Sequence, residues 1–264
     1  MSDIKISIIQ SKLAWEDKKL NLLNFENKIN AIKEKTDLIV LPEMFNTAFS
    51  MAPKKFAESP LGATHQWMMQ MSAKKGAAIA GSYMVTENGK QFNRFEIVYP
   101  DGSFDKYDKR HLFRMGNEHI HFDEGDKELI FDYKGWKIKA LICYDLRFPV
   151  FSKNTYHNGE YDYDILLYVA NWPKVRDDIW RSLLKARAIE NQAYVVAVNR
   201  VGIDGNGLDH WGSSCIIDAK GQYIIVPEVE VEFQTTATLS KSTLDDFRNK
   251  FTVGLDWDAH KIIN

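Results

Sequence analysis

Apolar and polar residues follow two different periods near the start of the chain. Alternation predicts a strand over Ile4–Gln10, and apolar residues at near-helical spacing predict a helix over Lys18–Lys35. The short apolar run Leu38–Leu41 is typical of a buried strand, and a second helix is predicted over Gly62–Lys75. The chain therefore begins with a strand-helix-strand unit and another helix.

The rest of the chain continues this mixture of elements. Strands are predicted over Ala77–Met84, Phe92–Tyr99, Phe104–Tyr107, Leu129–Tyr133, Trp136–Ile142, Ile165–Ala170, Ala193–Asn199, Ser213–Ile217, Tyr223–Val226 and Glu232–Thr238. Helices are predicted from Phe148, over Asp177–Asn191 and over Leu239–Lys250. Turns of the hairpin type at Asn88-Gly89 and Asp101-Gly102 make the sheet mixed. Together the elements predict one layered α/β domain over residues 1–264, with two comparable halves that meet near residue 140.

One long stretch, Lys109–Lys127, has no steady period and is rich in histidine, glycine and charge. Ordered loops of this length commonly build functional sites. We therefore expect this stretch to contribute to a site.

Composition excludes some classes of partner. The 264 residues carry 34 lysines and arginines against 36 acids, so a net charge of -2 gives no electrostatic reason to bind nucleic acid or an anionic membrane surface. The first residues lack the pattern of a signal peptide, and no window approaches the ~20 apolar residues of a membrane-spanning helix. Two cysteines fit a reducing compartment, so we expect a cytoplasmic protein.

Cys143 is the first candidate for chemistry, because the apolar run Trp136–Ile142 stops at this thiol and charged residues follow at once. Only about 3% of a free thiol is ionised at pH 7, so a catalytic cysteine needs a base or a nearby cation. Histidine is the usual base, and His111, His119 and His121 share the irregular loop. None of them follows an apolar strand, and a cysteine-histidine pair stays an open alternative.

Two other residues could assist a thiol. Glu43 comes directly after the apolar run Leu38–Leu41 and Pro42, and a buried carboxylate can act as a base. Lys109 follows the strand Phe104–Tyr107, where a cation could stabilise a thiolate. The alternatives are an acidic residue at a surface turn and a solvated basic run on a loop.

Three segments together resemble the nitrilase superfamily, whose catalytic glutamate, lysine and cysteine occur in this order. The matching segments are Leu41–Phe45, Tyr107–Phe113 and Ile142–Pro149. The resemblance implies a four-layer α-β-β-α sandwich of two mixed sheets, a catalytic triad of Glu43, Lys109 and Cys143, and a homodimer. A second family glutamate is similar to Glu118, although Glu124 lies nearer the following glycine.

Three further segments, Tyr168–Pro173, Ala186–Gln192 and Asn199–Gly202, look like the omega-amidase branch. Members of that branch hydrolyse the terminal amide of 2-oxoglutaramate and 2-oxosuccinamate. The same triad also serves N-carbamoyl amino acid hydrolysis and nitrile hydrolysis, so both remain alternatives. A non-catalytic binding or assembly protein is the alternative from another class.

The resemblance also directs attention to residues around the substrate. We expect the Tyr144 N–H to stabilise an oxyanion, and Arg147 to receive the substrate carboxylate. Arg147 could instead pair with Asp145 or cap the local turn. Asn171 and Trp172 are candidates to line the pocket, although Trp172 could equally belong to the core.

Other features of the chain point away from additional chemistry. Arg187 and Glu190, three residues apart on a helix, are expected to form a structural ion pair, and Cys215 to be a buried inert thiol. We expect no metal site and no cofactor, because no cluster has ligand spacing and no glycine-rich phosphate loop is present.

Overall fold

The computed structural model describes residues 3–259 and 262. The strands are β1 (Ile4–Gln10), β2 (Leu38–Val40), β3 (Ala78–Glu87), β4 (Lys90–Val98), β5 (Phe104–Asp108), β6 (Ile130–Tyr133), β7 (Trp136–Ile142), β8 (Tyr156–His157), β9 (Glu160–Tyr161), β10 (Ile165–Ala170), β11 (Tyr194–Asn199), β12 (Cys215–Ile217), β13 (Tyr223–Ile225) and β14 (Phe233–Leu239). The α-helices are α1 (Lys18–Ala31), α2 (Pro53–Phe56), α3 (Ala63–Lys75), α4 (Glu118–His121), α5 (Pro149–Ser152), α6 (Asp177–Glu190) and α7 (Lys241–Lys250). The 3-10 helices are η1 (Arg114–Gly116), η2 (Cys143–Arg147), η3 (Lys174–Arg176) and η4 (Val253–Asp256).

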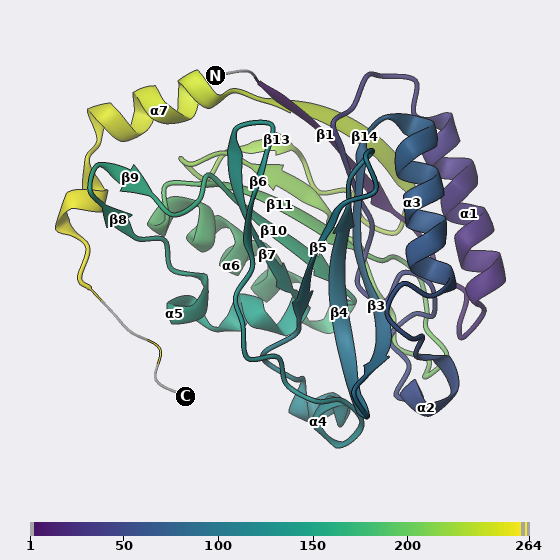
Figure 1. The fold of residues 1–264 in the computed structure, drawn as a ribbon. Coiled ribbons are helices and arrows are strands. Elements are labelled where there is room, and N and C mark those ends of the chain that lie inside the picture. Colours follow the sequence, from purple (N-terminus) through teal and green to yellow (C-terminus); the bar gives the residue numbers. More distant parts are fainter. Residues whose placement is uncertain (1–2, 260–261, 263–264) are drawn as a thin grey trace.

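Two six-stranded sheets form the centre of the molecule (Figure 1). The first sheet has the order β14-β1-β2-β3-β4-β5 and the second has the order β13-β12-β11-β10-β7-β6. Strands β1, β2 and β3 are parallel, as are β7, β10 and β11, whereas the outer strands pair antiparallel. Both sheets are therefore mixed, as predicted.

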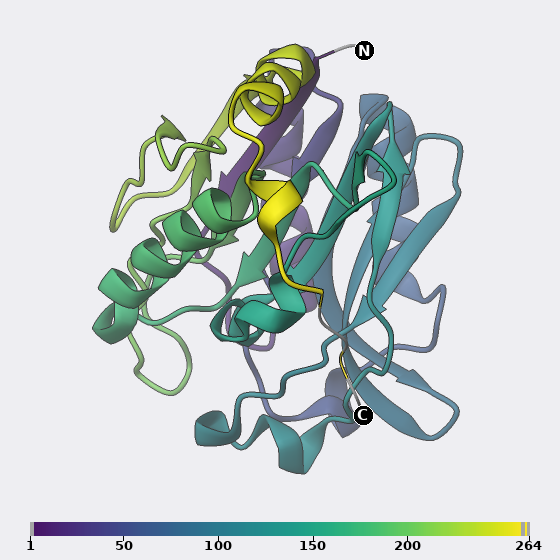
Figure 2. The same cartoon turned by 90° about the vertical axis from the view of Figure 1, so that its left-hand side faces the viewer.

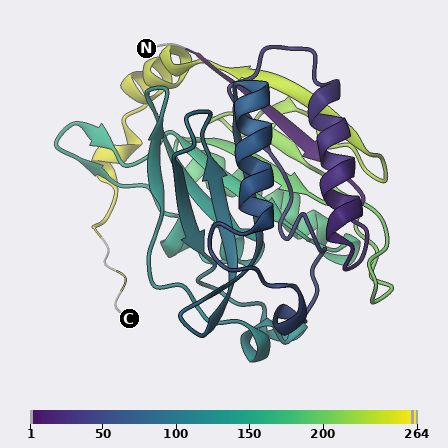
Figure 3. The ribbon, with the colours of Figure 1, turned by 45° about the vertical axis from the view of Figure 1, so that its right-hand side comes forward.

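Successive side chains of a strand point to opposite faces of the sheet and pack against the layers on either side. On β2, Leu38 and Val40 join the large core between the sheets, whereas Ile39 points outward and packs with Phe25 of α1 and Met68 of α3. Figure 3 shows α1 and α3 side by side over the outer face of the first sheet. Helix α6 covers the second sheet on the far side, with α7 above it (Figure 2). The architecture is the expected four-layer α-β-β-α sandwich.

Some boundaries differ from the sequence prediction for local physical reasons. Helix α1 ends at Ala31, four residues early, and α7 begins at Lys241 because the Ser240 side chain caps the helix by accepting the Thr243 N–H. The chain passes from the first sheet to the second in the loop between β5 and β6, and not near residue 140 as predicted. The last strand, β14, belongs to the first sheet again. Among residues 3–259 and 262, no helix is both long and apolar enough to cross a membrane.

Candidate active site

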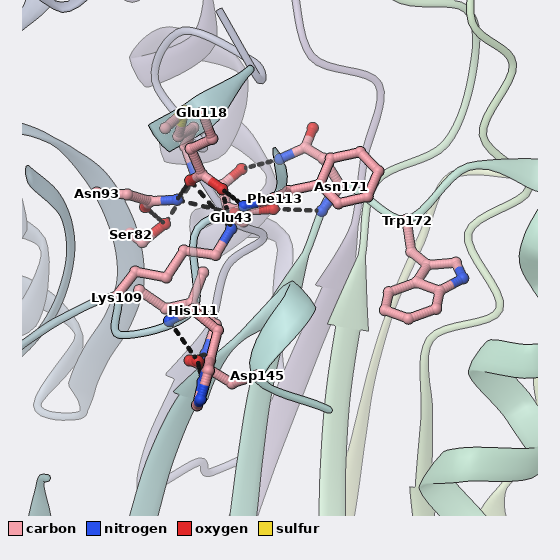
Figure 4. A network of polar contacts seen from close by, with 12 residues as sticks. Glu43, Ser82, Asn93, Lys109, His111, Phe113, Glu118, Asp145, Asn171 and Trp172 are labelled. Carbon is pink, nitrogen blue, oxygen red and sulfur yellow. Dashed lines mark hydrogen bonds and ion pairs between the residues drawn. The ribbon is translucent and has the colours of Figure 1, made fainter. Parts of the chain in front are cut away.

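The carboxyl ends of strands from both sheets meet at one edge of the sandwich. Glu43 lies three residues beyond β2, Lys109 directly follows β5, Cys143 follows β7 and Asn171 follows β10. In open α/β sheets, ligands bind at such strand ends. Figure 4 shows the side chains of Glu43, Lys109 and Asn171 converging on a network of polar contacts.

Glu43 is fully buried, and both oxygens of its carboxylate accept hydrogen bonds. Oε1 accepts from Lys109 Nζ and from Asn93 Nδ2, both at 2.8 Å, and Oε2 accepts from the Asn171 backbone N–H at 2.8 Å. The side chain of Asn171 also donates to the Glu43 carbonyl. Glu43 is therefore a fixed interior carboxylate, and the alternative of a surface turn is wrong.

Lys109 is also fully buried and lies between two carboxylates. Its Nζ is 2.8 Å from Glu43 Oε1, and 3.0 and 2.9 Å from the two oxygens of Glu118. Burial alone would lower the pKa of Lys109, but the charges of Glu118 and Glu43 hold that pKa above its ordinary value. Lys109 therefore stays an ammonium, and it is not part of a solvated basic run.

Glu118 begins α4, a single-turn helix inside the long irregular loop. Besides Lys109, its carboxylate accepts from the Phe113 backbone N–H at 2.7 Å and from Asn93 Nδ2 at 3.1 Å. Glu118 is buried, whereas Glu124 is exposed. Of the two glutamates considered from the sequence, the structure thus brings Glu118 to Lys109.

Cys143 lies at a sharp turn from β7 into η2. Its φ of +44° is in the left-handed region, which is unusual for a residue with a side chain. The turn is held by Asp145, whose Oδ2 accepts the Ile142 N–H at 2.9 Å and the Tyr107 hydroxyl at 2.8 Å. Cys143 keeps some exposure to solvent and lines a pocket.

His111 contacts Asp145, the residue that holds the turn at Cys143. His111 Nδ1 lies 2.7 Å from Asp145 Oδ1, and the His111 ring stacks on Phe148 at 3.7 Å between ring centroids. Asp145 thus links the segment that carries Lys109 to the turn that carries Cys143. The charged side chains that act on the Cys143 thiol are Glu43, Lys109 and Glu118, so its surroundings favour a carboxylate and not a histidine as its partner.

The charges of this cluster determine the resting state of the thiol. Burial and then the Glu43 charge raise the pKa of Cys143 well above its ordinary value, against the opposing effect of Lys109. Burial also raises the pKa of Glu118. With both glutamates ionised, the cluster already has one more negative than positive charge, so a thiolate is disfavoured. The thiol stays protonated at neutral pH until a base removes its proton.

We expect the Glu43→Gln substitution to shift the pH profile of Cys143 alkylation to lower pH. The substitution removes a nearby negative charge that opposes the thiolate, whereas Lys109 remains. Iodoacetamide labelling rates between pH 6 and 10, followed by intact mass, measure the midpoint. An unchanged or raised midpoint would contradict the electrostatic account, and Glu124→Gln at an exposed site is the control.

The pocket beside Cys143 has a volume of about 320 Å³. It includes the predicted residues Tyr144, Arg147, Asn171 and Trp172. The Arg147 guanidinium lies 5.1 Å from the centre of the Trp172 ring, and no ion pair joins it to Asp145, whose oxygens bind other groups. Trp172 is both part of the core and part of the pocket wall.

No argument from the sequence places the other lining residues in the pocket, although the loop of Asn206 and His210 was a candidate to reach it. The additional lining residues are Phe49, Met51, Phe113, Met115, Gly116, Pro173, Arg176, Asp204, Asn206, Leu208 and His210. Most lie on loops, which carry no periodic pattern. Asn93 was also missed, although a polar residue within the apolar part of a strand is a signal, because a buried amide needs partners. Its amide group bridges Glu43 and Glu118.

Features assigned a structural role from the sequence do lie outside the pocket. Arg187 forms an ion pair with Glu190 at 2.8 Å, and Cys215 is fully buried.

A larger open hollow of about 830 Å³, lined in part by Lys12 and Arg200, contains none of the cluster residues. Within the described residues, no group of three or more His, Cys, Asp and Glu side chains is arranged to hold a metal ion.

Known proteins resemble this chain over its whole length. Omega-amidase YafV of Yersinia enterocolitica is 44% identical over 265 residues, covering 100% of both chains. The 2-oxoglutaramate amidase of Bacillus subtilis (strain 168) is 32% identical, covering 92% of this chain and 97% of that protein. The crystal structure of XC1258 from Xanthomonas campestris, a CN-hydrolase superfamily protein with an arsenic adduct in its active site, has a TM-score of 0.96 and 42% identity, covering 99% of this chain and 100% of that chain. Residues 5–249 match the carbon-nitrogen hydrolase family, and the chain belongs to that family.

Proposed function

We propose that this protein is an omega-amidase, which hydrolyses the terminal amide of a 2-oxo dicarboxylic acid monoamide such as 2-oxoglutaramate or 2-oxosuccinamate. The observation that carries the proposal is the buried Glu43–Lys109–Glu118 cluster beside the thiol of Cys143, which lines a pocket together with Arg147. Relatives that bear the name omega-amidase, with 42% and 44% identity over essentially full length, support the same substrate class.

Catalysis begins with proton transfer from Cys143 to Glu43, while sulfur attacks the amide carbonyl. The transfer moves a proton within the buried cluster and leaves its net charge unchanged, so no new charge has to be desolvated. The raised pKa of Cys143 means that the nucleophile forms only when Glu43 accepts the proton.

Two donors stabilise the oxyanion of the tetrahedral intermediate. One is the Tyr144 N–H in the first turn of η2, where backbone N–H groups lack a partner within the helix. The other is Lys109, whose ammonium contacts Glu43 and Glu118 in the resting site. Protonation of Glu43 weakens its attraction for Lys109, so an N–H of Lys109 becomes available as the oxyanion forms.

The protonated Glu43 then gives its proton to the leaving nitrogen. The C–N bond breaks, ammonia leaves, and a thioester joins the acyl group to Cys143. Water, deprotonated by Glu43, attacks the thioester, and the C–S bond breaks to release the carboxylic acid and the thiol. Glu118 holds Lys109 in place throughout and is a positioning residue.

Arg147 is proposed to bind the carboxylate at the far end of the substrate. Its guanidinium is held against the face of Trp172 and has no carboxylate partner within the described residues. Asn171 fixes Glu43 through two hydrogen bonds and also lines the pocket.

We expect Arg147→Met to raise KM for 2-oxoglutaramate roughly 10-fold or more, since a charge-assisted hydrogen bond is lost. KM for a neutral amide such as butyramide should change little. Ammonia-release kinetics with both substrates measure the difference. Equal effects on the two amides would show that Arg147 does not bind the carboxylate.

The proposed function is tested by ammonia release from four substrates: 2-oxoglutaramate, glutamine, an N-carbamoyl amino acid and a simple nitrile. We expect the highest kcat/KM for 2-oxoglutaramate. Preference for the carbamoyl compound or the nitrile would favour the corresponding hydrolase that uses the same cluster. No turnover of any substrate, despite stoichiometric alkylation of Cys143, would favour a non-catalytic binding or assembly protein.

We also propose that residues 1–264 act as one domain in a cytoplasmic homodimer. Both cysteines are free, as a reducing compartment allows. Helices α5 and α6 and the adjoining η3 leave the apolar side chains of Val150, Val175, Ile179 and Ile189 exposed, which suits a surface that pairs with a second copy. Sedimentation equilibrium tests the dimer, and a monomer at micromolar concentration would contradict it.

A further inference from the structure

The pocket contains a second arginine, Arg176, which takes no part in the proposed reaction. The Arg176 guanidinium lies 5.4 Å from the centre of the Phe113 ring, and its Nη1 contacts the sulfur of Met115 at 4.0 Å. Thioether sulfur is a weak acceptor, so the hydrogen-bonding groups of Arg176 are poorly used. Like Arg147, Arg176 forms no ion pair with any carboxylate of residues 3–259 or 262.

The two arginines are held near one another by a shared residue. The Trp172 ring underlies the Arg147 guanidinium, and Trp172 Nε1 donates to the Arg176 carbonyl at 2.8 Å. Burial, and then the charge of Arg147, lower the pKa of Arg176, which is the effect expected of two like charges on one pocket. Two partly buried cations without an anion are unfavourable unless a ligand supplies the negative charge.

The remaining pocket wall offers little to a positive group. It is mainly aromatic, thioether and aliphatic, and Asp204 is the one carboxylate among the described residues that line it. Asp204 Oδ1 accepts the backbone N–H groups of Asn206 and Leu208, which hold it in a loop turn. Cations therefore outnumber available anions at this end of the pocket.

We propose that Arg176 and Arg147 together bind the 2-oxo carboxylate of the substrate, and that this pair of cations excludes amides of 2-amino acids. The proposal rests on the omega-amidase function and defines how its substrate class is selected. A 2-oxo acid presents a carboxylate and an adjacent carbonyl oxygen, both acceptors that match two guanidinium groups. Glutamine presents an ammonium at the same carbon, and this charge would face two cations.

The test uses probes that bind without being hydrolysed. 2-Oxopentanoate has the five-carbon skeleton of 2-oxoglutaramate with a methyl group in place of the amide, and L-norvaline carries an ammonium where 2-oxopentanoate has its carbonyl. Each is titrated as a protectant of Cys143 against iodoacetamide. Because Cys215 is fully buried, intact mass reports labelling of Cys143.

The variants are Arg176→Gln, Arg176→Lys and Arg114→Gln. Arg114 lies between Phe113 and Met115 in the sequence, is exposed, and does not line this pocket, so Arg114→Gln removes the same charge nearby without the proposed contact. We expect Arg176→Gln to need about 10- to 100-fold more 2-oxopentanoate for half protection. For Arg176→Lys, the concentration for half protection should lie between those of wild type and Arg176→Gln, and for Arg114→Gln it should equal that of wild type. L-norvaline should protect wild type at least 10-fold less well than 2-oxopentanoate.

Three outcomes would overturn the inference: unchanged protection of Arg176→Gln, equal protection of wild type by L-norvaline, or no protection of wild type by 2-oxopentanoate. Thermal denaturation of each variant shows whether a loss reflects unfolding, and a loss shared by Arg114→Gln would indicate only long-range charge. Failure to release ammonia from 2-oxoglutaramate is a separate result. It would remove the proposed reaction, while the protection experiment still decides whether the pocket selects 2-oxo acids.

Discussion

Cys143→Ala should abolish hydrolysis of 2-oxoglutaramate, with kcat reduced on the order of 10⁴-fold or more. The substitution removes the only atom that can form the thioester in the proposed mechanism. The cluster of Glu43, Lys109 and Glu118 does not depend on the thiol for any of its hydrogen bonds. The variant should therefore fold, and should bind 2-oxopentanoate with wild-type affinity by calorimetry.

Cys215→Ala is the matched control for the loss of a thiol. Cys215 is fully buried in β12, and burial raises the pKa of its thiol above the ordinary value. We expect the control to lose some stability but to retain kcat. Residual turnover in Cys143→Ala comparable with wild type would refute covalent catalysis at this residue.

Lys109→Met should lower kcat on the order of 100-fold or more and also destabilise the fold by about 3–5 kcal/mol near neutral pH. Methionine leaves Glu43 and Glu118 buried without a cation. At least one carboxylate must then have a pKa raised above its unfolded value, so stability is retained below that unfolded value near 4.3 and is lost as pH rises. The deficit relative to wild type should therefore be larger at pH 8 than at pH 5 in urea denaturation.

Two further variants test whether the effect of Lys109→Met comes from the loss of the buried ammonium. Lys106→Met removes the same charge from a partly exposed side chain on β5, where a surface ion pair with Glu87 contributes ~1 kcal/mol at most. The double variant Lys109→Met/Glu118→Gln removes one buried carboxylate and should recover stability without recovering kcat. Equal costs for Lys106→Met and Lys109→Met would contradict a special role for the buried ammonium.

The pattern of strands in the sequence predicted the positions of the catalytic residues. Cys143 and Lys109 directly follow strands that period alone predicts, and Glu43 follows β2 after a short connection. Their convergence depends on how two sheets pack, which no local pattern contains. The family resemblance supplied that information, and it also selected Glu118, which lies on a one-turn helix too short to show a period.

The rest of the site depends on loops. Arg176 on η3, Met115 on η1 and Asp204 in the loop after β11 reach one pocket from three separate connections. Side chains on such loops are placed by tertiary contacts, and the Trp172 hydrogen bond to the Arg176 carbonyl is an example. Arg147 was found in advance because it lies four residues after the nucleophile on the same turn.

The most direct test of the account is a titration of activity against alkylation of Cys143. Wild-type protein is labelled with substoichiometric iodoacetamide, the labelled fraction is determined by intact mass and peptide mapping, and ammonia release from 2-oxoglutaramate is measured on each sample. The account predicts a linear loss of activity that reaches zero at one label per chain, located on Cys143. Activity that persists in fully labelled protein, or an unlabelled protein that releases no ammonia from 2-oxoglutaramate, would contradict it.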